Sequence, residues 1–273
     1  MRNLRQTPSA FIAGLVLLSG STVAAATLTP AALAGWTSYL GSTERRIERE
    51  FGATDRFLAQ DFGPDAAGKR RALLGGAILV EPVDATDTQG RPIEVPSALV
   101  HHWRGAVFIP GARLGDLVTK LQSGAPAARQ EDVLQSKVLE RQPDRMRVFL
   151  RVQRTKFVTV VYDTEHTITF RRHGPARASS ASTATKIAEV ESPNTPRERE
   201  LRPGEDRGFL WRWNSYWRYE EGPGGVIAEC ESVSLSRGVP SVLWYLVGPL
   251  IRTTAKESME RTLATMRTRF GQL

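Results

Sequence analysis

Histidines and glutamates in two segments are the residues whose type and spacing are suited to acid–base chemistry. His101 and His102 are adjacent in a run of alternating apolar residues, so a β-strand there would send them to opposite faces. Glu229 and Glu231 stand two apart in a second such run and share one face with apolar neighbours. A carboxyl group held inward among apolar side chains has a raised pKa and can act as an acid or a base. Outward, solvated glutamates are the expected case.

His101 has the strand parity of the apolar residues around it, including Trp103, and is the histidine that we expect to lie inward. A partly buried histidine with satisfied hydrogen bonds is the default, because a catalytic base also needs a partner within reach. The single cysteine, Cys230, has no Cys/His metal spacing around it. The sequence also contains no G-x-S-x-G elbow and no H-E-x-x-H motif. We therefore assign no catalytic residue and predict neither a metal site nor a cofactor.

Aromatic side chains gather on one parity of the segment from Phe209 to Glu220. Because successive side chains of a strand point to opposite faces, these aromatic residues should lie on one face of a sheet. They either line a ligand cavity or pack against a helix, and we favour packing slightly. The candidate wall residues, on this strand and two others, are Trp103, Val148, Leu150, Trp211, Trp213, Trp217 and Tyr219.

The elements that must position these residues follow from the apolar periodicity. A helix is predicted at residues 30–51, after the N-cap and proline pair Thr29-Pro30, and a long amphipathic helix at Pro240 to about Phe270. A shorter helical pattern covers Leu114 to Leu121. Short connections between the predicted strands imply an antiparallel meander. The strands are predicted at 77–83, 98–109, 133–140, 145–154, 156–171, 182–190, 209–220 and 225–236, with an exposed loop at 193–208.

This order of elements resembles the START-like, or SRPBCC, superfamily over roughly residues 95–273. Two segments resemble its exported bacterial members in detail: Val100 to Pro110, reading VHHWRGAVFIP, and Ala228 to Pro240, reading AECESVSLSRGVP. The resemblance implies an α+β helix-grip fold, in which a curved antiparallel sheet wraps around the C-terminal helix. Between sheet and helix, family members hold lipids, sterols, polyketides or other apolar molecules. Some helix-grip proteins are cyclases or hydrolases.

The first residues have the layout of a secretory signal peptide. Arg2 and Arg5 precede an apolar run from Phe11 to Leu18, and small residues follow up to Ala26. An uncleaved membrane anchor is disfavoured, because spanning the bilayer takes about 20 apolar residues. We therefore expect a signal peptide at 1–26, an N-terminal helical extension at 27–95 and a START-like domain at 96–273. The expected destination is the periplasm or the exterior of the cell.

The charge of the chain is modest and scattered. The net charge is +8 at pH 7, and loss of residues 1–26 would remove two arginines and no acidic residue. A nucleic-acid-binding protein would concentrate its basic residues on one face, so we predict no nucleic-acid partner, while peripheral contact with an anionic envelope surface stays open. The favoured hypothesis is an exported protein that binds or carries an apolar small molecule or lipid. The alternatives are a cyclase or hydrolase using His101, Glu229 or Glu231, and an envelope scaffold with a closed core.

Overall fold

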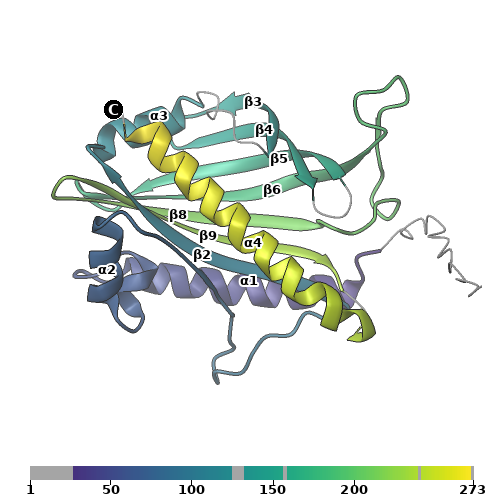
Figure 1. Ribbon diagram of the computed structural model, residues 1–273, viewed down its shortest axis with the longest axis horizontal. Coiled ribbons are helices and arrows are strands. Elements are labelled where there is room, and N and C mark those ends of the chain that lie inside the picture. Colours follow the sequence, from purple (N-terminus) through teal and green to yellow (C-terminus); the bar gives the residue numbers. More distant parts are fainter. Residues whose placement is uncertain (1–26, 125–131, 156–158, 239–240, 272–273) are drawn as a thin grey trace, which may run out of the picture.

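The computed structural model describes residues 27–124, 132–155, 159–238 and 241–271, with side chains left undescribed at 241–252 and 254. Nine antiparallel strands of the described residues form one sheet, in the order β1-β2-β9-β8-β6-β5-β4-β3, with β7 paired to β6. Figure 1 shows the C-terminal helix α4 crossing one face of this sheet and helix α1 lying along the other. The strands are β1 (Ile78–Pro82), β2 (Ala98–Pro110), β3 (Val133–Arg141), β4 (Arg145–Thr155), β5 (Thr159–Arg172), β6 (Arg177–Glu191), β7 (Arg199–Glu200), β8 (Arg212–Gly222) and β9 (Gly225–Arg237).

The predicted α+β helix-grip architecture is confirmed, and most strand boundaries agree with the periodicity. Strand β6 is the clearest exception, because it begins at Arg177 instead of the predicted Ser182. Its first residues are small or polar and gave no apolar alternation, but Arg177 lies opposite Glu220 of β8 and forms an ion pair with it at 3.1 Å. Pairing with β8 therefore stabilises the start of β6 as a strand, although the apolar pattern of the sequence did not predict it.

Helix α1 (Pro30–Phe51) begins as predicted, since the Thr29 side chain accepts a hydrogen bond from the Ala32 N–H at 3.1 Å. Only some of its apolar residues are buried. Leu33 is 41% exposed, whereas Trp36, Tyr39 and Ile47 are buried against the sheet. Tyrosine joins the stripe because its ring packs while its hydroxyl finds a polar partner.

The segment after α1 covers the same face of the sheet with two short helices. The 3-10 helix η1 (Ala59–Phe62) is followed by α2 (Ala66–Leu74). Asp65 starts α2, and its side chain accepts from the N–H of Gly68. Phe57, Leu58 and Leu73 are fully buried in a cluster with strand residues. Strand β1, which follows in the predicted extension, is hydrogen-bonded to β2 and so belongs to the sheet.

Helix α4 (Ser241–Phe270) packs mainly on β2 and β1, while α3 (Leu114–Gln122) lies near its C-terminal end. Gly105 of β2 is the point of closest approach. A Cβ atom there would come within 2.7 Å of Leu263 and 2.8 Å of the Leu79 carbonyl oxygen. The last part of α4 is therefore seated directly on the sheet, where Leu263 and Phe270 are fully buried.

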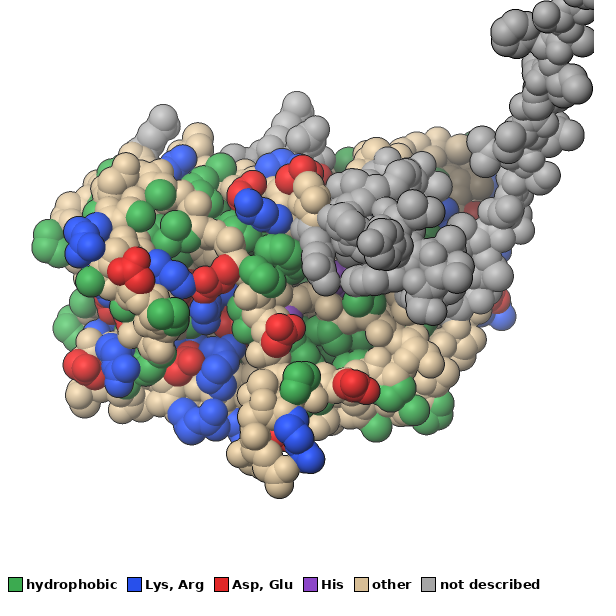
Figure 2. Space-filling model, turned by 60° about the horizontal axis from the view of Figure 1, so that its bottom comes forward, with side chains coloured by type: hydrophobic (Ala, Val, Ile, Leu, Met, Phe, Trp, Pro, Cys, Tyr) green, Lys and Arg blue, Asp and Glu red, His purple; other side chains and the backbone are tan. Residues whose placement is uncertain are grey.

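The distribution of charge on the surface and the apolarity of the helices are relevant to contact with nucleic acids and membranes. Figure 2 shows side chains of both charges interspersed over one face, in place of a patch of a single sign. Within the described residues, no helix has the length and apolarity needed to cross a bilayer.

Candidate functional site

The sheet face that meets α4 holds six of the seven predicted wall residues. Trp103 is paired with Ser232 and Trp213 with Ser234 in the ladder, so both rings lie on the face of Cys230 and Val107. Trp103, Trp217 and Tyr219 belong to the hydrophobic cluster that includes Met259 and Leu263 of α4, and Trp213 and Leu150 belong to a neighbouring cluster. Val148 lies opposite His166, whose ring contacts Trp213. We call this surface the α4 face.

Trp211 is the exception among the wall residues, and the sequence-based assignment was wrong for it. It packs in the cluster of Trp36 and Tyr39 of α1, on the opposite side of the sheet. The cause is that β8 begins only at Arg212, so the alternation of the strand does not govern Trp211. Its indole N–H instead donates to Asp206 at 3.3 Å.

The aromatic rings of the α4 face contact one another in ordered pairs. Trp217 and Tyr219 are stacked, with 6.0 Å between centroids and 7° between planes. His166 meets Trp213 edge to face at 5.0 Å. Trp103, Trp213 and Trp217 are only half-buried, whereas Tyr219 is buried. Part of the surface of these three tryptophans therefore stays exposed.

Polar atoms on the α4 face are mostly hydrogen-bonded to hydroxyl groups of the sheet itself. The Trp213 indole donates to Ser232 at 3.3 Å, and the Tyr219 hydroxyl lies 3.3 Å from that of Ser180. Two histidines follow the same rule: His101 is 2.9 Å from the Ser236 hydroxyl, and His166 is hydrogen-bonded to Ser182 and Thr164. Burial lowers the pKa of both imidazoles to about 4, so both are neutral at pH 7.

On the opposite side, which we call the α1 face, buried charges join the sheet to the N-terminal segment. The Glu229 carboxylate accepts from the backbone N–H groups of Ala59 at 2.7 Å and Gln60 at 3.1 Å. Arg218 donates to the Phe57 carbonyl at 2.8 Å and pairs with Glu50. Arg218 and Glu229 are each only 2% exposed. Burial raises the pKa of Glu229, although Arg218 and the backbone donors oppose that shift.

A second chain of hydrogen bonds runs along the same face. The Tyr39 hydroxyl is 2.9 Å from Nδ1 of His102, and Nε2 of His102 is 2.7 Å from Glu231, which also pairs with Arg46. The backbone N–H of Ala85 donates to the Tyr39 hydroxyl at 3.1 Å. Burial alone would raise the pKa of Glu231, but the His102 hydrogen bond and the Arg46 charge outweigh it and lower the value to about 2. Burial raises the pKa of Tyr39 to about 12.

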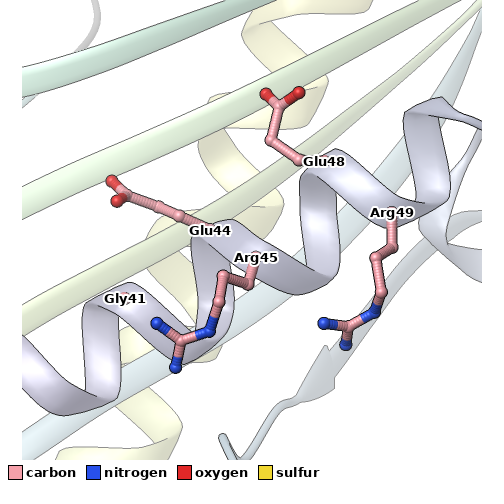
Figure 3. Close-up of a pocket in the computed structure, with 5 residues that line it drawn as sticks. All are labelled: Gly41, Glu44, Arg45, Glu48 and Arg49. Atoms are coloured by element: carbon pink, nitrogen blue, oxygen red, sulfur yellow. The ribbon is translucent and has the colours of Figure 1, made fainter.

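Two surface hollows accompany helix α1. One, of about 620 Å³, lies along its outer side, and Figure 3 shows Glu44 and Glu48 pointing to one side and Arg45 and Arg49 to the other. Glu44 accepts from the Tyr216 hydroxyl at 2.7 Å. The second hollow, of about 390 Å³, lies between α1 and residues 84–88 and reaches His102. Both are lined by polar and charged side chains of α1.

The structure does not bring together the three acid–base candidates. His101 lies on the α4 face, whereas Glu229 and Glu231 lie on the α1 face. Glu229 is bonded to the backbone of residues 59 and 60, and Glu231 contacts His102 of β2 and pairs with Arg46 of α1. The two glutamates are buried, so the expectation that they are solvated was wrong. Arg218, Arg104 and Arg46 hold them there as ions or hydrogen-bonded acids. In the described part of the chain, no three acidic, histidine or cysteine side chains cluster as metal ligands.

Comparison with known proteins yields structural likeness alone. No family model matches the chain, and no curated protein matches it in sequence. A STAR-related lipid transfer protein of Xanthomonas axonopodis is 19% identical with a TM-score of 0.45, over 69% of this chain and 98% of that one. A human lipid transfer and protein localization domain is 13% identical with a TM-score of 0.41, over 76% and 96%. A Streptomyces aromatase/cyclase is 12% identical with a TM-score of 0.39, over 64% and 95%.

The strand order and the place of the last helix decide the fold. All pairings of the described sheet are antiparallel, β2 lies beside β9, and the C-terminal helix α4 covers one face. The chain has the START-like helix-grip fold, with an additional N-terminal helix on the outer face of its sheet.

Proposed function

We propose that this protein binds or carries an apolar small molecule or lipid between the α4 face and helix α4. The observation that carries the proposal is the state of Trp103, Trp213 and Trp217, which lie on the face toward α4 yet stay half-buried. Covering a further ~100 Å² of such a ring stabilises by about 2–3 kcal/mol, so an apolar occupant would gain strongly from this surface. On the same face, the polar atoms of Trp213 and Tyr219 are already hydrogen-bonded to Ser232 and Ser180 of neighbouring strands. An occupant would therefore contact the ring surfaces of these residues and not their polar atoms.

Export is part of the proposal. Residues 1–26 lie outside the described residues, and their charge and apolar pattern is that of a secretory signal. A carrier with such a signal would work in the periplasm or outside the cell, with peripheral contact to an envelope surface. The mass of the protein recovered from an exporting host tests this: loss of residues 1–26 supports export, and a full-length cytoplasmic chain contradicts it.

Native mass spectrometry of that purified protein, followed by solvent extraction, tests ligand binding. We expect a stoichiometric apolar molecule, or uptake of a fluorescent lipid probe by the emptied protein. An empty protein that takes up no probe would favour a scaffold with a closed core.

The facing of the wall residues is tested by a matched pair on β8. Trp213→Ala removes a ring from the α4 face, while Arg212→Ala changes the adjacent residue, which is paired with Leu235 toward α1. We expect Trp213→Ala to weaken probe binding at least about tenfold, or ~1.4 kcal/mol, and Arg212→Ala to leave it within about twofold. Equal effects in the titration would contradict the assignment of faces.

A further inference from the structure

Tyr162 of β5 departs from the hydrogen-bonding rule of the α4 face. It is 2% exposed and packs with Val152 and Trp213, but its hydroxyl has no hydrogen-bond partner among the described residues. The other buried phenol of this face, Tyr219, is bonded to Ser180. A buried hydroxyl without a partner destabilises a protein by about 1–3 kcal/mol, so its presence calls for a ligand or a function. Burial raises the pKa of Tyr162, which keeps the hydroxyl protonated and able to donate.

Positive charge gathers at the same end of the face. Arg154 of β4 lies with its guanidinium 5.9 Å from the Trp213 ring and acts electrostatically on Tyr162. It shares one carboxylate oxygen of Asp132 with Arg261 of α4, at 3.0 Å and 3.3 Å. Two guanidinium groups therefore share a single carboxylate oxygen, which leaves N–H groups of both arginines for other acceptors.

The neighbouring acids are already engaged. Glu189, which lies opposite Tyr162 in the ladder, is paired with Arg207 at 2.6 Å. Asp206 accepts the N–H groups of Gly208 and Trp211. Neither carboxylate is hydrogen-bonded to Arg154 or to the Tyr162 hydroxyl. Beyond Asp132, the described acceptor of Arg154 is the Gln153 carbonyl oxygen, at 3.4 Å from Nη1, so the guanidinium keeps further N–H donors.

We propose that the ligand of the α4 face is amphipathic, with an apolar body against Trp213 and Trp217 and a singly charged oxyanion head, of the carboxylate kind, at Arg154, Arg261 and Tyr162. The inference rests on the proposed function. The arginines supply charge-assisted hydrogen bonds, and the phenol supplies a neutral donor in a dry position. A neutral lipid of the same length would keep the ring contacts and lose these bonds.

The test compares oleate with methyl oleate on the emptied full-length mature protein, by competition with a fluorescent lipid probe. We expect oleate to bind about tenfold more tightly, the factor that one charge-assisted hydrogen bond supplies. Arg154→Gln should abolish this preference while the affinity for methyl oleate stays unchanged, and Arg154→Lys should restore part of it. Tyr162→Phe should reduce the preference and leave thermal stability equal or higher, because it removes the unpaired hydroxyl.

The outcomes separate the two proposals. If both lipids bind equally and Arg154→Gln changes neither, the charged head is wrong while the carrier function stands. If neither lipid nor the probe binds, the carrier function itself is wrong. A preference that survives both Arg154→Gln and Tyr162→Phe would place the head elsewhere and overturn this site.

Discussion

On the α1 face, arginine and glutamate side chains reach out of the sheet to residues 39–60, whereas on the α4 face histidine, tyrosine and tryptophan are bonded sideways to hydroxyls of neighbouring strands. The first arrangement uses the polar atoms of the sheet to hold another segment. The second keeps them within the sheet and presents ring surfaces. One sheet thus has a face joined by buried charges to the N-terminal segment and a face whose tryptophan rings stay half-buried on the side of α4.

The two faces differ in how strictly their contacts fix one arrangement of the chain. Removing one partner of a buried ion pair strongly destabilises the protein. The α1 face is therefore stable only with the N-terminal segment in its observed position. Apolar ring contacts are tolerant of the shape and identity of what covers them. Substitutions on each face test this difference between them.

Removing Arg218 should have the largest effect on stability. Arg218→Met leaves the buried Glu229 without its ion-pair partner and Glu50 with Arg46 alone, and we expect a loss of about 3–5 kcal/mol in the free energy of unfolding. Urea denaturation measures it. The control is Arg45→Met on α1, an exposed residue without a carboxylate partner among the described side chains, which should change stability by less than about 0.5 kcal/mol. Equal small losses would show that the network does not hold the α1 face.

Acidification should weaken the protein through His166. Its folded pKa of about 4 lies below the ordinary 6.5, so below pH 6.5 the unfolded chain binds a proton that the folded one does not. Stability is therefore full above pH 6.5 and falls as pH drops toward 4, by at most about 3 kcal/mol for this group. His166→Gln should lose less stability over the same interval when unfolding is followed at pH 7, 6, 5 and 4.5. An unchanged pH dependence would mean that His166 is accessible to protons in the folded state.

A larger residue at Gly105 should destabilise the packing of α4 against β2. Gly105→Ala places a Cβ within 2.7 Å of Leu263 and against a backbone oxygen, and we expect a loss of about 1–3 kcal/mol from overpacking. Gly115→Ala in α3, where a Cβ meets nothing within 4 Å, should be neutral or stabilising by up to about 1 kcal/mol. Thermal unfolding of the two variants gives the comparison, and a tolerated Gly105→Ala would mean that α4 shifts easily on β2.

Truncating Trp211 should have the smallest effect on ligand binding. It lies with Trp36 and Tyr39 on the α1 face, so Trp211→Ala should change probe affinity by less than about twofold, or ~0.4 kcal/mol. Loss of binding as large as that expected for Trp213→Ala would erase the distinction between the two faces.

Local pattern was sufficient for most of the fold. Alternation and turn residues located the strands within a few positions, and parity placed His101, Trp213 and Trp217 correctly relative to one another. It failed where the strand itself did not extend, as at Trp211, and where small polar residues formed a strand, as at Arg177 to Ser180. Both errors arise because these residues are placed by pairing with distant strands. The local sequence pattern of one segment contains no information about that pairing.

The polar parts of the molecule were harder to predict. His166, Tyr162 and Thr164 share one parity, and that alternation is visible in the sequence, but only the packing of Trp213 shows that it faces inward. The roles of Arg218 and Glu229 depend on residues 57–60, more than 150 positions away in the chain. A rule that expects charged residues outside cannot anticipate a pair that is buried because its partners arrive from another region.

The pairing of β2 with β9 also has a consequence for the time at which the sheet forms. These strands are hydrogen-bonded along their full length, although β3 to β8 lie between them in the sequence. Contacts between distant segments form slowly, and β2 has no partner on this side until β9 has been synthesised. Until β9 is present, the sheet stays divided into the β1-β2 pair and the part formed by β3 to β8, so joining these two parts is a late step in folding.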